Sequence, residues 1–328
     1  MRRLALLAVA ALLLAGCGER TERTRPGKTQ QFQLMLDFLP NADHAGIYAA
    51  QANHRFSDVG LDVKIRVPSD PAAPIRQVAA GRVDLAISYE PEVLRARDHG
   101  LKVVSVGALV QRPLTTIIAL PGSKIKKPAD LRGKTVGTAG IDYQHAFLQT
   151  ILERAAVPPA SVKERNVGFN LVPALLTKKV DAILGGFLNY EAVELRQRKK
   201  KPVVIPVDRV GVPRYDELVF VTSESAAREN ADAIRAFLGA VARGTHDLRS
   251  DPVSALVKAN PDLDAKLQRA AVKVTLPLFQ PPSGKPFGYQ EPSRWRTFAD
   301  FMRKSGLIQH PASARGAFTN GLLPGQGP

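Results

Sequence analysis

The sequence predicts an α/β protein with two α/β lobes that are joined by a hinge and have a ligand cleft between them. Short apolar strands alternate with helices through most of the chain, and this order produces a parallel sheet with helices on both faces. The alternation breaks at Arg112-Pro113 and then begins again. The strand at 83–87 (VDLAI) has a close counterpart at 180–184 (VDAIL), and each leads into a turn with polar and aromatic residues. Two such turns, one in each lobe, indicate a ligand held between them.

The first lobe is predicted from residues 31–114 and 223–310. Phe32, Leu34 and Leu36 alternate as in a strand with one buried face. Pro40-Asn41 then ends this strand and caps the helix that follows. Further strands are predicted at 61–67, 83–87 and 103–110, and helices at 43–54, 75–80, 91–99 and 226–248.

The second lobe is predicted from residues 115–222. Its strands are predicted at 115–120, 134–138, 162–167, 180–184 and 217–222, and the last of these is expected near the return crossing. Helices are predicted from the turn at 139–143 to about residue 156, at 170–178, and directly after residue 191. The tail at 311–328 is small and polar, so it is expected to be disordered.

The chain is strongly basic, with a formal net charge of +16. Such a charge suits either nucleic acid or an anionic membrane surface. The sequence has no recognition-helix signature, no RNA-stacking motif and no basic tail, so no nucleic-acid partner is expected. The basic residues are spread along the chain, and their one dense run, 196–201, is typical of the solvated end of a helix.

The N-terminus has the features of an export signal. Arg2 and Arg3 precede an apolar run at 4–14 that is too short to span a bilayer. The residues that follow, Leu-Ala-Gly-Cys17, resemble a bacterial lipobox, which implies cleavage before Cys17 and acylation of that residue. The alternative is an ordinary secretory signal in which Cys17 has no role.

The lipobox divides the N-terminal region in two. Residues 1–16 are expected to be a lipoprotein signal peptide, and the polar residues 17–30 a flexible tether. The protein is then expected in the cell envelope, lipid-anchored to the membrane on its extracytoplasmic side. Cys17 is the single cysteine, which excludes an intrachain disulfide and a multi-cysteine metal site.

Motifs for catalysis or metal binding are missing from the sequence. Gly133-Lys134-Thr135 resembles the end of a phosphate loop, but Pro128 stands where that loop needs a glycine. There is no dinucleotide-binding or nucleophile-elbow motif. His44 and His54 are too far apart for one helix face. The sequence therefore predicts a protein that is not an enzyme, with no cofactor and no metal.

Candidate ligand-binding residues of the first lobe follow its strands. Carboxyl ends of strands are where open α/β sheets bind ligands. A carboxylate there accepts hydrogen bonds from amine or ring N–H groups, and an aromatic ring stacks on a flat heterocycle. The candidates are Asp37, Phe38, Asn41 and His44 after the first strand, and Ser88, Tyr89 and Glu90 after the third. The alternative roles are core packing for Phe38 and helix capping or surface contacts for the others.

Candidate residues of the second lobe lie in three places. Asp142 and Tyr143 follow its second strand, and Phe187 and Asn189 follow the strand at 180–184. Asp216 and Glu217 lie near the return crossing and are expected to reach the cleft. Capping is the alternative for Asp142 and Tyr143, and a solvated loop for Asp216 and Glu217.

The stretch 36–48, LDFLPNADHAGIY, resembles the opening of the substrate-binding proteins related to thiamine-pyrimidine synthases. Their pattern is Leu-Asp-Trp-x-Pro-Asn followed by His-x-Gly-x-Tyr, and the resemblance covers roughly residues 32–305. Aminopyrimidine binders of this family also have Gly-x-aromatic-Trp-x-x-Glu, which is matched here at 185–191. The resemblance implies that Glu191 pairs with the aminopyrimidine edge. Phe38 and Leu188 stand where the family has Trp.

The resemblance implies a periplasmic binding protein type II-like fold and a solute-binding lipoprotein of an ABC importer. Such a protein captures a flat heterocycle, here a thiamine-related pyrimidine of the formylaminopyrimidine type, and delivers it as a monomer to the permease. Because both Trp positions differ, riboflavin is the alternative ligand. Two functions of other classes are the alternatives. A pyrimidine synthase of this fold carries a cysteine-rich motif and requires iron, whereas this chain has only Cys17. An envelope adaptor would have an empty cleft.

Overall fold

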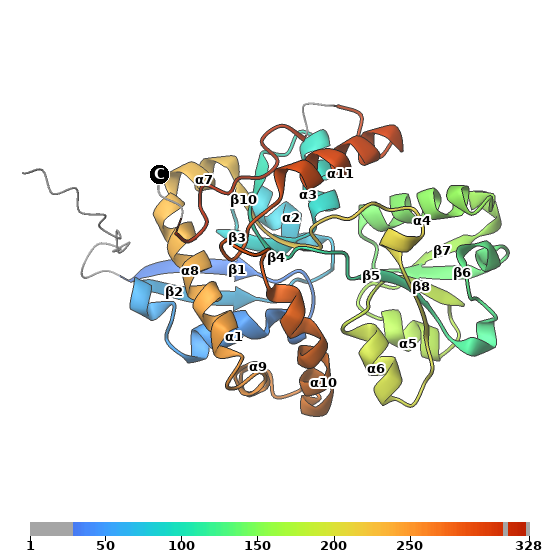
Figure 1. Cartoon of the computed structure of the whole chain (residues 1–328), viewed down its shortest axis with the longest axis horizontal. Helices are drawn as coiled ribbons and strands as arrows, with labels where there is room; N and C mark the ends of the chain where they lie inside the picture. The colour runs from blue at the N-terminus through green and yellow to red at the C-terminus, as the bar shows by residue number, and fades with distance from the viewer. Residues whose placement is uncertain (1–28, 311–313, 326–328) are drawn as a thin grey trace, which may run out of the picture.

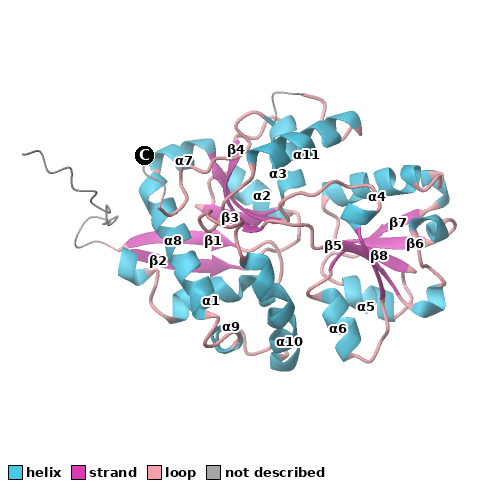
Figure 2. Cartoon of the chain, viewed as in Figure 1, coloured by secondary structure: helices cyan, strands magenta, loops and turns pink. Residues whose placement is uncertain are grey.

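Two five-stranded sheets organise the protein, as seen in a computed structural model that describes residues 29–310 and 314–325 (Figures 1 and 2). Each sheet is flanked by helices, so the predicted α/β fold with two lobes is confirmed. The predicted signal peptide, Cys17 and nearly all of the predicted tether lie outside the described residues. Within the described ranges, no helix combines the length and the apolar character needed to cross a membrane.

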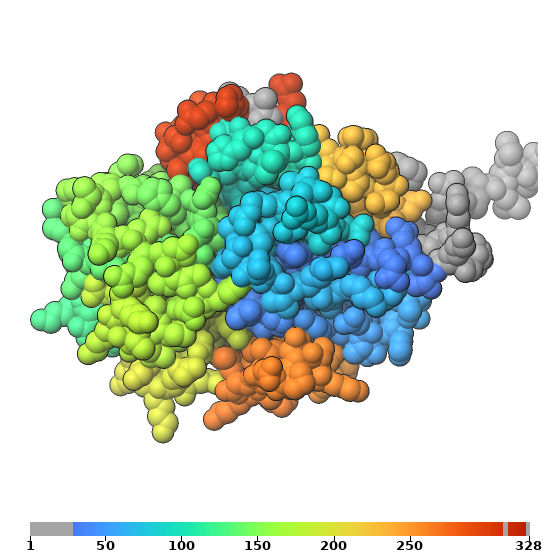
Figure 3. Space-filling model, turned by 180° about the vertical axis from the view of Figure 1, so that it is seen from behind, coloured from blue at the N-terminus to red at the C-terminus, as the bar shows by residue number. Residues whose placement is uncertain are grey.

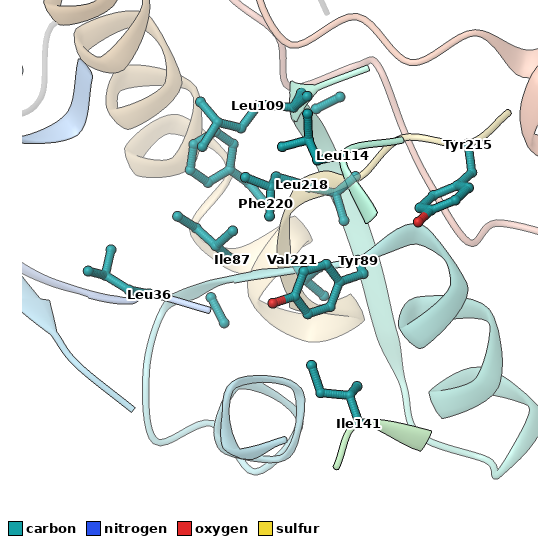
Figure 4. Packing of buried hydrophobic residues seen from close by; sticks show 14 of the residues in the cluster. Leu36, Ile87, Tyr89, Leu109, Leu114, Ile141, Tyr215, Leu218, Phe220 and Val221 are labelled. Atoms are coloured by element: carbon teal, nitrogen blue, oxygen red, sulfur yellow. The ribbon is translucent and has the colours of Figure 1, made fainter. Parts of the chain in front are cut away.

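The sheet of lobe 1 has the strand order β2-β1-β3-β10-β4. Its strands are β1 (Gln30–Met35), β2 (Leu61–Arg66), β3 (Leu85–Ser88), β4 (Val103–Val110) and β10 (Leu218–Ser223). β1 is parallel to β2 and β3, whereas β10 runs antiparallel to β3 and β4. In this core Leu36, Ile87 and Phe220 are fully buried (Figure 4).

Helices cover both faces of the first sheet (Figure 1). They are α1 (Ala45–Ala52), α2 (Ala73–Ala79), α3 (Glu90–Asp98), α7 (Glu224–Glu229), α8 (Ala231–Asp247), α9 (Ser254–Ala259), α10 (Ala265–Thr275) and α11 (Pro292–Lys304). α1 and α8 pack closely, because a Cβ at Gly244 would lie only 2.3 Å from the Gly46 carbonyl oxygen. The helix predicted over 226–248 is divided into two helices in the structure, α7 and α8, which meet at Asn230.

The sheet of lobe 2 has the strand order β7-β6-β8-β5-β9. Its strands are β5 (Thr115–Ala119), β6 (Thr135–Thr138), β7 (Lys163–Asn166), β8 (Ala182–Phe187) and β9 (Val203–Pro206), and its helices are α4 (Asp142–Arg154), α5 (Leu171–Leu176) and α6 (Glu191–Gln197). Short 3-10 helices complete the two lobes at Ala42–His44, Ser57–Val59, Pro121–Ser123, Pro128–Leu131, Pro159–Ser161, Val207–Arg209 and Leu276–Phe279. β9, which pairs with β5, was not predicted from the sequence.

The second crossing between the lobes, at which the chain returns to lobe 1, lies earlier in the sequence than predicted. Residues 217–222 were assigned to lobe 2, yet β10 lies between β3 and β4 in the first sheet and pairs with both. The pairing is favourable there because Leu218, Val219 and Phe220 are fully buried in the core of lobe 1. The return to lobe 1 therefore precedes Leu218.

The C-terminal segment also differs from its prediction. Residues 314–325 were expected to be disordered, but they pack against lobe 1. Ala317 and Leu323 are fully buried, and Phe318 forms a bridge with Ser105 of β4 and lies 4.9 Å from the Trp295 ring. These few apolar side chains are enough to order an otherwise polar segment.

Candidate ligand-binding cleft

A pocket lies between the lobes, at the carboxyl ends of β1, β3, β6 and β8. It encloses about 370 Å³, counting the part that is open to solvent. Its lining comes from both lobes and comprises Asp37, Phe38, Asn41, Tyr89, Ala139, Ile141, Tyr143, Gln144, Leu171, Gly185, Phe187, Tyr190 and Glu191. Figure 4 shows two of these residues facing each other, Tyr89 from lobe 1 and Ile141 from lobe 2. This position is the general ligand site of open α/β sheets.

Asp37 is held by two side chains of its own lobe. The Tyr89 hydroxyl donates to Asp37 Oδ2 at 2.8 Å, and His44 Nε2 lies 2.9 Å from Oδ1. The Asn41 backbone N–H donates to His44 Nδ1 at 3.2 Å, so Nδ1 is the acceptor and Nε2 carries the proton that is donated to Asp37. Asp37 is therefore fixed in orientation before any ligand arrives.

Asn41 shapes the turn that carries these groups. Its side-chain oxygen accepts from the Asp43 backbone N–H at 2.8 Å, as expected of a helix N-cap. This cap begins the short helix that contains His44, and so places the imidazole beneath Asp37. The predicted turn is confirmed, and His44 contacts Asp37 but does not line the pocket.

Aromatic rings continue from the pocket toward the hinge. The Tyr89 and Tyr143 rings meet across the two lobes with centroids 5.3 Å apart. Phe147 packs against Tyr143 at 5.1 Å and against Tyr215 at 5.6 Å. Burial raises the pKa of the Tyr89 and Tyr143 hydroxyls well above the usual value, so both remain protonated donors at neutral pH. The Tyr143 hydroxyl has no hydrogen-bond partner within the described part of the chain.

Glu191 is the carboxylate that lobe 2 contributes. It is 8% exposed and stands at the start of α6, where its Oε2 accepts from the Phe187 backbone N–H at 2.7 Å. No side chain in the described ranges donates to it. Burial raises the pKa of Glu191 to about 7, so its protonation changes near neutral pH.

Flat aromatic side chains line the rest of the pocket. Phe38 meets Phe169 of lobe 2 edge to face, with ring centroids 4.7 Å apart. Phe187 and Tyr190 come from the opposite wall, and the Tyr190 hydroxyl accepts from Gln268 of α10 at 2.9 Å. Phe38 therefore contacts an aromatic ring across the cleft instead of being enclosed in the core of its own lobe.

Gln144 and Gly185 form a part of the site that was not predicted. Gln144 Oε1 accepts from the Ala139 backbone N–H at 2.8 Å, which fixes the turn after β6. A Cβ at Gly185 would lie 2.3 Å from Gln144 Nε2, and Gly185 has a φ of +105°. Only glycine suits this position. Gln144 directly follows the predicted pair Asp142-Tyr143, and the lining residue Tyr190 directly precedes Glu191. Including one more residue on the outer side of each predicted turn would have found Gln144 and Tyr190.

Three predicted residues lie near the pocket but do not line it. The Ser88 hydroxyl donates to the buried Glu92 carboxylate, and burial raises the pKa of Glu92 to about 8. Glu90 Oε2 accepts from the Asp216 backbone N–H at 2.6 Å. Asp142 is exposed and lies 3.8 Å from Arg95 of lobe 1. Their hydrogen-bonding groups are directed to the protein or the surface.

Asn189 joins the lobes instead of lining the pocket. Its Nδ2 donates to Asp43 Oδ1 at 2.6 Å and to Thr275 Oγ1 at 2.9 Å, and both partners belong to lobe 1. Burial, followed by the nearby charge of Asp37, raises the pKa of Asp43 well above the usual value. Gln197 adds a second contact by donating to the Lys266 carbonyl at 3.0 Å. The rear view shows the lobes touching, so the structure is a closed form (Figure 3).

Asp216 and Glu217 lie in the hinge. Glu217 Oε2 accepts from the backbone N–H groups of Leu114 and Thr115 at 2.6 and 2.8 Å and from the Tyr215 hydroxyl at 3.0 Å. The two chain crossings are thereby joined by one carboxylate, whose pKa burial raises to about 7. Asp216 is bound by Arg294 and Trp295 of α11. Neither residue lines the pocket.

Two α/β lobes, two hinge crossings and a pocket between the lobes define the periplasmic binding protein fold. The alkanesulfonate-binding protein SsuA from Xanthomonas axonopodis pv. citri, solved with MOPS bound, has the same fold. The two chains superpose with a TM-score of 0.70 at 16% identity, over 89% of this chain and 99% of that chain.

The chain belongs to the family described as NMT1/THI5 like, which matches residues 41–255. It is 33% identical over 322 residues to the formylaminopyrimidine-binding protein of Halalkalibacterium halodurans, covering 96% of this chain and 97% of the relative. It is also 28% identical over 308 residues to the riboflavin-binding protein RibY of Chloroflexus aurantiacus, covering 90% of this chain and 87% of the relative. The family inferred from the residues at 36–48 and 185–191 is confirmed.

Proposed function

We propose that this protein is the solute-binding component of an ABC importer and captures a thiamine-related pyrimidine of the formylaminopyrimidine type. One observation carries the proposal: Asp37 and Glu191 line a single aromatic-walled pocket from opposite lobes. The relative that binds formylaminopyrimidine matches almost the whole chain, which supports the same ligand class.

An aminopyrimidine complements this pocket chemically. Its exocyclic amine donates hydrogen bonds that a carboxylate accepts, and its ring nitrogens accept hydrogen bonds. Glu191, with a pKa of about 7, either donates a proton to a ring nitrogen or receives the hydrogen bond of a protonated ring. Phe38, Tyr143 and Phe187 provide surfaces for stacking on the flat ring.

Hinge closure is the proposed mechanism of capture. Because the two carboxylates belong to different lobes, a ligand that binds both favours the closed form by its differential affinity. The residues 111–114 and 207–217 connect the lobes and would absorb the backbone rotation. The permease of the importer would then recognise the closed monomer.

A lipid anchor is proposed for the mature protein. The lipobox-like sequence ending at Cys17 supports it, and the described fold begins only twelve residues later, at position 29. Acylation at Cys17 would hold the protein on the extracytoplasmic side of the membrane. Metabolic labelling with a fatty acid tests this, because Cys17→Ala should abolish incorporation.

A thermal-shift screen tests the ligand. The chain from residue 29 onward contains every described helix and strand, so it is the protein to use. The probes are a formylated aminomethylpyrimidine, thiamine, riboflavin and sulfonate anions. A ligand at 100 times its Kd stabilises the protein by about 2.7 kcal/mol. A shift with the aminopyrimidine alone supports the proposal, and a shift with none of the probes overturns the ligand assignment and favours an adaptor.

Riboflavin is the second candidate ligand. Phe38 and Leu188 replace the two Trp residues of aminopyrimidine binders, and one relative is a riboflavin-binding protein. The Tyr89 and Tyr143 rings are in contact across the closed pocket, with centroids 5.3 Å apart, so the lobes must separate to admit either ligand. Quenching of flavin fluorescence at micromolar protein would replace the pyrimidine assignment with riboflavin.

An enzymatic role as a pyrimidine synthase is the remaining alternative. In related synthases a cysteine-rich motif accompanies an iron requirement, and the single cysteine here, Cys17, cannot supply such a motif. We therefore expect no pyrimidine product when the purified protein is incubated with iron. Iron-dependent formation of a pyrimidine would show that the protein is an enzyme.

A further inference from the structure

The edge of the second sheet that lies farthest from the pocket has an unusual composition. The amino ends of β6, β8 and β9 lie together there, because Val136 and Ala119 both pair with Ala182, and Ala119 also pairs with Val203. The loop from β5 to β6 and the loops that enter β7, β8 and β9 all lie at this edge. The five strands span roughly 20 Å in width.

Nine exposed lysines lie on these loops or at the start of β7, and we call this surface the lysine pole. They are Lys124, Lys126, Lys127, Lys163, Lys178, Lys179, Lys199, Lys200 and Lys201. Within the described ranges none of them forms an ion pair. The exposed Arg132 and Arg165 add further positive charge.

The acidic residues at this edge neutralise only part of the lysine pole. Asp181 Oδ2 accepts from the Thr135 backbone N–H at 2.8 Å. Asp130 Oδ2 accepts from the backbone N–H groups of Lys126 and Lys127 at 2.9 and 3.1 Å. A backbone hydrogen bond does not remove the charge of a carboxylate, so Asp130, Asp181 and the exposed Glu153 at the end of α4 offset part of the charge of the nine lysines. The lysine pole therefore carries a large local excess of positive charge.

Three of these lysines lie at backbone positions that favour glycine. Lys124, Lys178 and Lys199 have φ values of +61°, +57° and +56°. Glycine adopts this conformation at no cost, whereas a residue with a Cβ is destabilised. Lobe 1 uses glycine after α2 and α3, at Gly81 and Gly100, but it has His54 in the same conformation after α1, and lobe 2 has Ala156 after α4. Lobe 2 thus places lysine at positions where the fold itself favours glycine.

We propose that the lysine pole is a docking surface for an anionic lipid bilayer. Lysine is a compact point charge on a flexible stem, which suits a diffuse layer of lipid phosphates, whereas site-specific recognition of one phosphate favours the fork of arginine. Each lysine near an anionic membrane strengthens the attachment, and the effect decays within a Debye length. The lysine pole has no exposed aromatic residue on which a nucleic-acid base would stack.

The position of the lysine pole predicts how the protein is oriented on the membrane. β1 begins at Gln30 at the end of lobe 1 that points away from lobe 2, while the lysine pole is the far end of lobe 2 (Figure 1). A chain tethered through its N-terminus and docked through the lysine pole therefore lies lengthwise along the membrane. The inference concerns a surface remote from the pocket, so it goes beyond the proposed ligand-binding function and does not depend on the ligand.

Cosedimentation with vesicles tests the proposal. The chain from residue 29, which carries no acyl group, is mixed with phosphatidylcholine vesicles with or without phosphatidylglycerol. The pole variant changes Lys178, Lys179, Lys199, Lys200 and Lys201 to Gln. The control variant makes the same change at five exposed lysines of lobe 1, Lys102, Lys258, Lys266, Lys273 and Lys304, so its net charge is identical.

The unmodified chain should bind the anionic vesicles and lose binding as salt is raised. The pole variant should lower the partition coefficient by at least about tenfold, and the control variant by much less. Equal losses in the two variants, or no binding to anionic vesicles, would overturn the proposal. Stronger binding to duplex DNA than to the vesicles would replace it with a nucleic-acid surface.

A triple variant, Lys124→Gly, Lys178→Gly and Lys199→Gly, separates docking from folding. Relief of the positive φ values should raise the Tm, while the loss of three charges should lower vesicle binding. A raised Tm with unchanged vesicle binding would contradict the role of these lysines in docking.

Discussion

The two carboxylates of the pocket are held in different ways. Asp37 in lobe 1 accepts hydrogen bonds from two side chains, His44 at 2.9 Å and Tyr89 at 2.8 Å. Glu191 in lobe 2 accepts from one backbone N–H, that of Phe187 at 2.7 Å. The wall formed by lobe 1 is therefore pre-organised, whereas the wall formed by lobe 2 keeps a carboxylate that can change its protonation and hydrogen bonding. We call the lobe 1 side, with Asp37, the fixed wall of the pocket and the lobe 2 side, with Glu191, the adaptable wall.

The largest expected effect follows from removing the fixed carboxylate. Asp37→Ala leaves the buried His44 and Tyr89 donors without their acceptor, so the free energy of unfolding should fall by about 3 kcal/mol. Urea denaturation measures this change. Asp142→Ala is the control, because this carboxylate is exposed and its loss should change stability by less than about 0.5 kcal/mol. Similar losses in both variants would show that Asp37 is not specially held.

Removing the adaptable carboxylate should affect binding more than folding. Glu191→Ala should weaken an aminopyrimidine by about 1.5–3 kcal/mol, the value of a hydrogen bond to a charged group. Calorimetry gives the affinity and urea denaturation the stability. Glu191→Gln is the matched control for stability, because its side-chain oxygen still accepts from the Phe187 N–H, and it should lose the charge-assisted part of the affinity as well. If Glu191→Ala destabilises the fold as much as Asp37→Ala and leaves affinity unchanged, the contrast between the walls is lost.

The pH dependence of affinity should come from the adaptable wall. Glu191 has a pKa of about 7 in the free protein, so it carries a proton below pH 7 and has lost it above. A complex that shares one proton between Glu191 and a ring nitrogen must take up that proton above pH 7. Affinity should therefore fall up to tenfold, or about 1.4 kcal/mol, per pH unit above 7. Calorimetry in buffers of different ionisation enthalpy detects the proton uptake, and a flat profile would contradict it.

The smallest expected effect concerns an aromatic contact between the walls. Phe38→Ala removes the edge-to-face contact with Phe169 and a stacking surface for the ligand, which should cost about 1 kcal/mol of affinity. Leu39→Ala is the control, since Leu39 is the next residue and 45% exposed. A loss of stability with unchanged affinity in Phe38→Ala would make Phe38 a packing residue.

The sequence predicted the two lobes because hydrophobic alternation and the repeated Asp-containing strand are local features. It could not place β10, because strand order depends on which edges meet in space, and residues 218–223 read equally well in either sheet. The ordered tail was missed for a similar reason. Its order depends on buried contacts of Ala317 and Leu323 with distant parts of lobe 1.

The candidate site was predicted in location more than in detail. Seven of the predicted residues line the pocket, namely Asp37, Phe38, Asn41, Tyr89, Tyr143, Phe187 and Glu191. The carboxyl end of a strand can be found from the sequence, but the direction of each side chain cannot. Ser88 bonds Glu92, and Asn189 bonds Asp43 across the lobes, and both partners lie outside the predicted set.

The position of β10 between β3 and β4 constrains the order in which the chain can fold. β4 pairs only with β10 among the named strands, and β10 is synthesised after the whole of lobe 2. When the chain emerges N-terminus first, lobe 2 can form from one continuous segment. The first sheet cannot be completed until β10, the last of its strands in the sequence, has emerged. Lobe 1 thus begins first and finishes last, with the exposed edges of β3 and β4 open to wrong pairing in the interval.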